Sequence, residues 1–267
     1  MVGGVAEGTT STQQPDLSIG REGYVAIVEI TRPPNNFFDV ALIRDIADAL
    51  DELAAGDCRA VVLASQGKHF CAGADFSSPR PAGAVDQEPT PHLYEEAIRI
   101  FAQPLPIVAA VQGAAIGGGL GLALAADFRV AAPVARFAAN FARLGFHHGF
   151  ALSVTLPRAV GEQRAAELLY TGARIGGDEA LRIGMCDRLV PVDELRAAAV
   201  AFATEIATSA PLAVRSIRET LRDGLVDQVR AATARERAEQ ERLQRTDDWK
   251  EGVAAVAARR EPDFSGR

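Results

Sequence analysis

Two short, wholly apolar runs of the chain, residues 60–64 (AVVLA) and 107–111 (IVAAV), each lead directly into a glycine-containing turn. An apolar run of this length suits a strand that is buried on both faces. Residues 40–54 precede the first of these runs with apolar side chains at helical spacing, and Asp39 is placed to cap that helix. Helices that alternate with buried strands predict an α/β fold.

The same alternation continues along the chain. Further strands are predicted at residues 24–30 and 128–132, and further helices at residues 92–101, 120–126, 192–208 and 225–245. The first strand ends at the breaker RPPNN (residues 32–36), and Pro211 separates the last two helices. Strands are therefore expected mainly in the first two thirds of the chain, and helices after residue 192.

Three regions are expected from these patterns. Residues 1–15 are rich in Gly, Thr, Ser and Gln and are predicted to form a disordered leader, and residues 16–200 should form the core. Residues 201–267 should form a helical region that packs against other subunits. Within the core, residues 77–91 are rich in Pro, Gly and Ser and predict a mobile surface loop.

Charge and cysteine usage exclude several classes of protein. The net charge of -7 leaves no basic surface for nucleic acid or for an anionic membrane. No apolar run reaches the roughly 18 residues of a membrane span, and the N-terminus has no hydrophobic signal segment, so a cytoplasmic protein is expected. Three cysteines without CxxC spacing and four histidines without HExxH predict neither disulfides nor a bound metal.

Two glycine-containing turns carry the strongest functional signal. The first, residues 65–75 (SQGKHFCAGAD), follows one buried strand, and the second, residues 108–119 (VAAVQGAAIGGG), runs from the other strand into a helix. Glycines at a helix start expose backbone N–H groups and the positive end of the helix dipole at one point. Such a point favours a phosphate or a developing oxyanion, as in the enolate of a thioester.

A dinucleotide-binding turn is the alternative explanation of a glycine-rich strand-to-helix junction. Residues 117–121 (GGGLG), however, do not follow an N-terminal strand, and the strand at residues 128–132 ends in alanines where that motif requires an acidic residue. The sequence therefore favours the oxyanion site.

The segments FCAGAD and AVQGAAIGGG resemble the two signature segments of the crotonase (enoyl-CoA hydratase/isomerase) superfamily. The resemblance implies a crotonase-type spiral of repeated β-β-α units with C-terminal helices that form homotrimers or hexamers. It also implies lyase or isomerase chemistry on acyl-CoA thioesters, as in fatty acid metabolism, with no cofactor beyond the CoA moiety of the substrate. The oxyanion donors would be the backbone N–H groups of Ala72 and Gly118.

The same resemblance implies where coenzyme A binds. The CoA moiety would lie against the first motif, near Phe70, Ala72, Ala74 and Asp75. Phe264, in the C-terminal tail, would reach the adenine bound by a neighbouring subunit.

The chain departs from the family at both catalytic carboxylates. Hydratases of the family use two glutamates, and the matching positions here are Gly121 and Phe141. Neither side chain carries a proton, so the standard hydration mechanism has no visible acid or base. Gly121, Phe141 and His92 would line the acyl pocket instead. For Phe141 core packing is the alternative role, and for His92 helix capping.

His147 and His148 are the candidates for a replacement acid or base, because histidine titrates near neutral pH. The alternative is that they hydrogen-bond the backbone or lie at a subunit contact. Asp127 and Cys71 are expected to be structural: a hydrogen-bonding carboxylate and a small buried side chain.

Two functions remain open from the sequence. The first is an enzyme that acts on an acyl- or enoyl-CoA with an atypical acid and base. The second is a non-catalytic acyl-CoA-binding protein that kept the pocket and lost both glutamates. A hydrolase is disfavoured, because residues 119–121 (GLG) provide no serine beside the glycine triplet.

Overall fold

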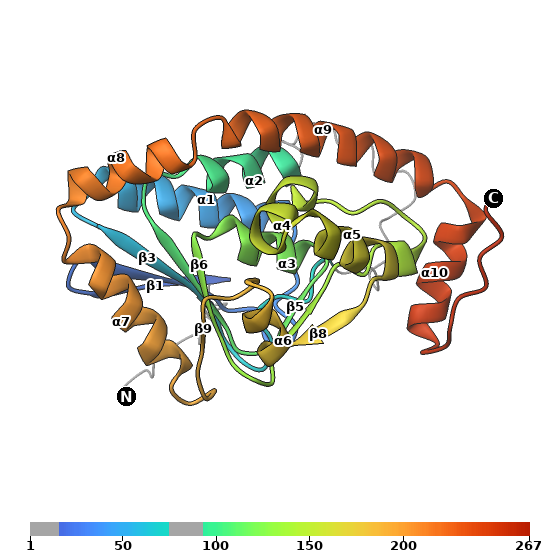
Figure 1. Ribbon diagram of the computed structural model, residues 1–267, viewed down its shortest axis with the longest axis horizontal. Coiled ribbons are helices and arrows are strands. Elements are labelled where there is room, and N and C mark those ends of the chain that lie inside the picture. Colours follow the sequence, from blue (N-terminus) through green and yellow to red (C-terminus); the bar gives the residue numbers. More distant parts are fainter. Residues whose placement is uncertain (1–15, 75–92) are drawn as a thin grey trace, which may run out of the picture.

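The structure, a computed structural model, describes residues 16–74 and 93–267 and contains two sheets (Figure 1). The larger sheet has the strand order β1 (Leu17–Glu22), β2 (Val25–Ile30), β3 (Ala60–Ser65), β4 (Ile107–Val111), β6 (Phe128–Ala131) and β9 (Arg188–Leu189). The smaller sheet has the order β5 (Ala114–Ile116), β7 (Arg136–Ala138) and β8 (Arg174–Gly176). In the larger sheet all neighbouring strands are parallel except β1 and β2.

The helices begin and end as follows: α1 Val40–Ala55, α2 Leu93–Ala102, α3 Gly118–Ala125, the 3-10 helix η1 Ala142–Leu144, α4 Leu152–Val160, α5 Glu162–Thr171, α6 Gly177–Arg182, α7 Leu195–Ala207, α8 Pro211–Leu221, α9 Leu225–Leu243 and α10 Asp247–Ala257. The Asp39 carboxylate accepts a hydrogen bond from the Leu42 N–H at 2.9 Å, which confirms the predicted cap of α1. The predicted helices at residues 40–54, 92–101, 120–126, 192–208 and 225–245 are confirmed to within three residues at each end.

The chain passes from the larger to the smaller sheet in each turn of a spiral. It leaves β4 at Gln112, enters β5 and continues into α3, and in the same way it runs from β6 through β7 to η1 and α4. Isolated bridges pair Cys71 with Ala115 and Phe38 with Ala74, so two earlier turns of the chain extend the smaller sheet. This repeated β-β-α path confirms the predicted fold class.

Alternating side chains of the larger sheet supply two cores. Val61 and Leu63 point into the main core with α1, α2 and α3, whereas Val62 and Ala64 point to the opposite face. Helix α7 covers that opposite face through Leu195, Ala199 and Ala203, among others. The strands are therefore buried on both sides, as their wholly apolar sequences predicted. The expected boundary at residue 200 falls inside α7.

Helices α8 and α9 run along the top of the molecule in Figure 1, and α10 lies at its right-hand end. Helix α9 packs against α2 and α4, and α10 packs against η1 at the far end. Helix α8 buries none of its residues, and Leu212, Ile217 and Leu221 are exposed. Among the described residues no single helix is long and apolar enough to cross a membrane, and α7 and α8 satisfy such a test only as a pair bent by 101°.

Asp127 joins the sheet to α8, which confirms its predicted structural role. Its carboxylate accepts from the Ile107 N–H at 2.9 Å, from Arg218 Nε at 3.0 Å and from Arg222 Nη1 at 2.7 Å. Both arginine side chains are mostly buried, so this ion pair network lies largely out of water. Removing one partner of such a network leaves buried charge uncompensated.

We therefore expect Asp127→Asn to lower the free energy of unfolding by about 3 kcal/mol. Glu205→Gln, which breaks the exposed ion pair of Glu205 with Arg188, is the matched control and should cost less than about 1 kcal/mol. Urea unfolding followed by circular dichroism measures both. Equal losses for the two variants would contradict the role of Asp127.

Candidate active site

Close contact between two backbone segments brings the glycine motifs together. A Cβ atom on Gly113 would lie 2.0 Å from the Lys68 carbonyl oxygen, and one on Gly119 would lie 2.1 Å from the Cys71 carbonyl oxygen. Real Cβ atoms do not approach backbone atoms so closely, so both positions require glycine. The hydrogen bond from the Cys71 N–H to the Ala114 carbonyl, at 2.9 Å, joins the motifs directly.

Two amide side chains hold the first motif in place. Asn36 is fully buried with a left-handed φ of 49°, and its Nδ2 donates to the carbonyl oxygens of Gln66 at 2.8 Å and His69 at 2.6 Å. Gln112 Nε2 donates to the carbonyl oxygens of Ser65 and His69 at 2.9 and 3.1 Å. Asparagine tolerates the left-handed conformation better than most residues. These bonds fix the position of the turn that follows β3.

The structure corrects one predicted oxyanion donor. The Ala72 N–H donates to the Asn35 carbonyl at 2.9 Å, so it is not free to bind a ligand. In an extended segment, successive N–H groups point in opposite directions. Gly73 breaks this alternation before Ala74, because its φ is +91°. Neither Ala74 nor Gly118 donates its N–H to an acceptor within the described part of the chain.

Ala74 and Gly118 also belong to neighbouring segments. A Cβ atom on Gly73 would lie 2.9 Å from the Ile116 carbonyl oxygen and 3.8 Å from the Gly118 nitrogen. Gly118 is the first residue of α3, where backbone N–H groups have no partner within the helix. The pair of unused donors at this point is therefore Ala74 and Gly118.

Aromatic rings surround the start of α3. A Cβ atom on Gly118 would lie 2.4 Å from Phe38 Cζ, and one on Gly117 would lie 3.6 Å from Phe141 Cζ. The Phe38 and Phe150 rings contact each other with centroids 5.6 Å apart. The neighbourhood of the Gly118 N–H is therefore apolar, which strengthens electrostatic interactions made there.

Phe150 fills the space beside Gly121. A Cβ atom on Gly121 would lie 2.5 Å from Phe150 Cβ, and both residues are buried. Phe150 therefore occupies the space that a side chain at residue 121 would need.

Phe141 belongs to a row of aromatic side chains. It is 8% exposed, and its ring centroid lies 5.3 Å from that of Phe146. Phe146 in turn lies 4.5 Å from Trp249 of α10, the only tryptophan in the chain. Phe141 therefore packs in the core, the alternative role given for it, and its ring also lies close to Gly117.

His147 and His148 stack on each other, with ring centroids 4.1 Å apart. His147 Nδ1 lies 2.8 Å from the His148 carbonyl oxygen, and His148 Nε2 lies 2.8 Å from Ser153 Oγ. Burial, and then the charge of His147, lower the pKa of His148 to about 4. His148 is therefore neutral at neutral pH and carries no imidazolium proton for acid catalysis. Neither ring is hydrogen-bonded to a described residue of the two glycine motifs.

Glu236 of α9 is the acidic residue that the sequence analysis missed. It is fully buried, and its carboxylate accepts hydrogen bonds from the Ala151 N–H, the Ser153 N–H and Ser153 Oγ. A signal was present: Leu225, Val229, Thr233 and Glu236 are the buried residues of α9 and recur at helical spacing. The many exposed charges of this helix hid it.

The predicted CoA contacts are dispersed in the structure. The Phe70 side chain is fully buried, so only the backbone of this residue could contact a ligand. Ala74 is half-buried and Phe264 is 41% exposed on the tail that folds back on α10. Asp75 and His92 lie outside the described residues. Cys71 is buried as predicted, and burial raises the pKa of its thiol to about 12.

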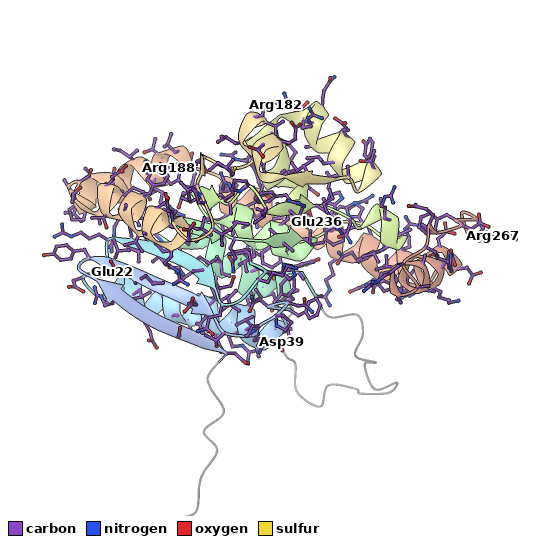
Figure 2. All side chains as sticks on the ribbon, turned by 90° about the horizontal axis from the view of Figure 1, so that it is seen from below. Glu22, Asp39, Arg182, Arg188, Glu236 and Arg267 are labelled. Atoms are coloured by element: carbon purple, nitrogen blue, oxygen red, sulfur yellow. The ribbon has the colours of Figure 1, made fainter. Side chains whose placement is uncertain are left out.

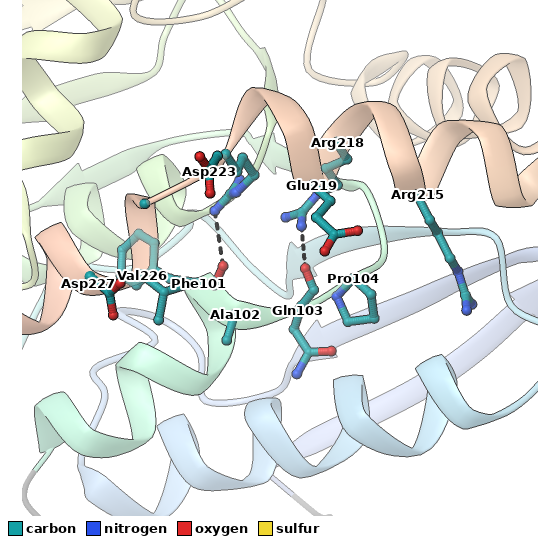
Figure 3. A pocket seen from close by; sticks show the side chains of 12 residues that line it. Phe101, Ala102, Gln103, Pro104, Arg215, Arg218, Glu219, Asp223, Val226 and Asp227 are labelled. Atoms are coloured by element: carbon teal, nitrogen blue, oxygen red, sulfur yellow. Dashed lines mark hydrogen bonds between the residues drawn. The ribbon is translucent and has the colours of Figure 1, made fainter.

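A cavity of about 470 Å³ lies elsewhere, between the end of α2, helix α8 and the start of α9 (Figure 3). Arg215, Arg218 and Arg222 line it, and Figure 3 shows Arg218 directed at the Gln103 carbonyl. No residue of the glycine motifs borders this cavity. It is formed around the ion pair network of Asp127. In the part of the chain that the structure describes, no group of three or more His, Cys, Asp or Glu could hold a metal ion.

The lowered pKa of His148 predicts an acid-sensitive fold. Because the folded state binds this proton less tightly than the unfolded state, stability is fully present above pH 6.5 and is lost as the pH falls from 6.5 to about 4. We expect His148→Gln to lose less free energy of unfolding than the wild type over that window. Urea unfolding at pH 7 and pH 4 measures how the free energy of unfolding changes with pH for the wild type and for the variant. The difference between the two proteins isolates the contribution of His148. An equal change in the free energy of unfolding between pH 7 and pH 4 for both proteins would therefore contradict the lowered pKa of His148.

Comparisons with known proteins show the family of the chain. The family model of enoyl-CoA hydratase/isomerase matches residues 20–267. A probable enoyl-CoA hydratase of Rhodobacter capsulatus is 34% identical over 91% of this chain and 95% of its own. A crotonyl-CoA hydratase of Syntrophomonas wolfei is 33% identical over 93% of this chain and 97% of its own.

Solved structures are similar over nearly the whole chain. An enoyl-CoA hydratase/isomerase from Pseudoalteromonas atlantica superposes with a TM-score of 0.85 at 31% identity, and covers 94% of this chain and 100% of its own. A carnitinyl-CoA hydratase from Mycobacterium avium gives a TM-score of 0.83 at 29% identity, with 96% and 100% covered. The chain belongs to the enoyl-CoA hydratase/isomerase family.

Proposed function

We propose that the protein is an enzyme that binds an acyl- or enoyl-CoA thioester and stabilises its enolate-like oxyanion with the backbone N–H groups of Ala74 and Gly118. The observation that carries this proposal is the pair of unused donors at the junction of the two glycine motifs. Backbone donors aimed at developing charge in an apolar site stabilise a transition state without reorganising.

The names of the relatives support the substrate class. They include hydratases of enoyl-, crotonyl- and carnitinyl-CoA, all of which are thioesters. Two N–H groups that bind the thioester carbonyl oxygen stabilise an enolate. Such an enolate forms by addition of water at the β-carbon in hydration and by loss of a proton in isomerisation. No cofactor beyond the CoA moiety is needed for such a step.

The acid and base of the reaction are proposed to differ from a pair of glutamates. Gly121 and Phe141 place no carboxylate at the start of α3, and Phe150 fills the adjoining space. His147 remains the better of the two histidine candidates, because burial keeps His148 neutral and bonded to Ser153. A protein that binds the thioester without turning it over is the alternative, and the apolar surroundings of Gly118 favour it.

We further propose that the CoA moiety lies along the backbone of residues 70–74, next to Asp75. Phe264 is proposed to reach the adenine of a neighbouring subunit in a homotrimer or hexamer. The exposed apolar residues Ile217 and Leu221, one turn apart on α8, support subunit packing through this helix, because exposed apolar patches mark association surfaces. A cytoplasmic location is proposed with the rest.

Turnover and binding of crotonyl-CoA separate the two functions. We expect binding, followed through the fluorescence of Trp249, together with a loss of the conjugated enoyl-thioester absorbance at high protein concentration. Saturable binding with no loss of absorbance for crotonyl-CoA or a longer enoyl-CoA would reject the enzyme and leave the binding protein.

The oxyanion site itself is tested by Gly118→Ala. The added Cβ would meet Phe38 Cζ at 2.4 Å and displace either the ring or the N–H, so turnover should fall by about 100-fold. Gly20→Ala is the matched control, because its Cβ would lie 3.9 Å from the nearest atom, Ile27 Cβ. Circular dichroism confirms folding, and the double variant Gly118→Ala/Phe38→Leu should recover part of the rate. Undiminished turnover in folded Gly118→Ala would contradict the site.

A further inference from the structure

Glu236 lies well inside the molecule (Figure 2), although it belongs to the highly charged helix α9. We propose that Glu236 is a positioning residue of the acyl site: it holds the turn at Phe150 and Ala151, and thereby fixes the Phe150 ring against Gly118 and Gly121. The inference rests on the proposed function, since it concerns the wall of the proposed oxyanion site.

The carboxylate caps α4 from another helix. Ala151, the N-cap residue of α4, has no side chain that can accept a hydrogen bond. Glu236 Oε2 accepts from the Ala151 N–H at 2.9 Å, and Oε1 accepts from the Ser153 N–H at 3.0 Å and from Ser153 Oγ at 2.6 Å. A negative charge at a helix N-terminus is stabilised by the helix dipole. The first turn of α4 is thus held by α9.

The turn that Glu236 holds is strained. Phe150 and Ala151 have φ angles of 58° and 59°, a left-handed conformation that residues with a Cβ rarely adopt. Such a conformation persists only where surrounding contacts enforce it. Here the Glu236 carboxylate accepts from the Ala151 N–H at 2.9 Å and so holds the turn.

The conformation of this turn determines the position of the Phe150 ring. Its Cδ2 atom would lie 3.6 Å from a Cβ on Gly118, and its Cβ atom 2.5 Å from a Cβ on Gly121. The ring also contacts Phe38 and Phe101, at centroid distances of 5.6 and 6.4 Å. A change of the turn therefore moves the ring that borders the start of α3.

Only a carboxylate satisfies every donor at this point. Three hydrogen atoms point at Glu236, and a glutamine has one acceptor oxygen and would turn its NH₂ group toward one of the donors. Burial raises the pKa of Glu236 above its ordinary value, and the hydrogen bonds from Ser153 and Ala151 offset only part of that rise. His148 Nε2 lies 3.9 Å away, and no oxygen of Glu236 faces solvent. Glu236 therefore acts through the turn and does not touch a substrate.

The readout of the test is the preference for the acyl group, which we take as the ratio of the Kd of free CoA to the Kd of crotonyl-CoA, together with kcat. Glu236→Gln should lower kcat by about 100-fold, because displacement of a site by about 1 Å has that effect. It should also bring the ratio toward one while the Kd of free CoA stays unchanged. Glu241→Gln, on the exposed face of the same helix, removes the same charge and should behave as the wild type.

Rescue by glycine separates positioning from general stability. Glycine adopts the left-handed conformation without strain, so Ala151→Gly should restore about tenfold in kcat to Glu236→Gln. Arg259→Gly, which relaxes a left-handed residue with a φ of 53° far along the chain, should restore nothing.

Three results would overturn the inference. The first is that Glu236→Gln has the same kcat and acyl preference as Glu241→Gln. The second is that Glu236→Gln weakens the binding of free CoA by as large a factor as it lowers kcat. The third is that Arg259→Gly restores as much kcat to Glu236→Gln as Ala151→Gly does. If the wild type prefers crotonyl-CoA to free CoA but does not turn it over, only the proposed enzymatic activity is rejected, because the ratio of Kd values still tests the role of Glu236. A wild type without acyl preference rejects the proposed function and the inference together.

Discussion

The backbone contact between the two glycine motifs is the constraint on which the site depends. Carbonyl oxygens of Lys68 and Cys71 occupy the space that side chains on Gly113 and Gly119 would fill. This contact brings the segments that follow β3 and β4 to one point. There the N–H groups of Ala74 and Gly118 have no acceptor among the described residues. Buried amides fix one side of that point and the dipole of α3 the other. The spiral therefore serves to bring two short backbone segments together.

Aromatic side chains surround this point. Phe38, Phe141 and Phe150 lie next to the start of α3, and the buried carboxylate of Glu236 is directed at the backbone of α4 instead. An apolar site strengthens the effect of the two N–H groups on a thioester carbonyl. Under the proposed function, the chain would keep the electrostatic part of the family's chemistry and change the proton transfer.

Much of the fold could be predicted from the sequence, because the buried strands β3 and β4 are wholly apolar and α1 and α9 have clear helical spacing. The region between β7 and β9 could not, since its short elements form only against other parts of the chain. The site was predicted less well. Ala72 was chosen in place of Ala74 because the reversal of N–H direction at Gly73 is not visible in a sequence, and Glu236 was hidden among exposed charges.

Polarisation of a bound thioester tests the central claim most directly. The carbonyl stretching frequency of crotonyl-CoA labelled with 13C at its carbonyl can be followed by infrared difference spectroscopy in the free and the bound state. Two hydrogen bonds from Ala74 and Gly118 in an apolar site should lower that frequency on binding, and Gly118→Ala should reverse most of the shift. A carbonyl frequency that is unchanged in the saturated wild-type complex would contradict the account.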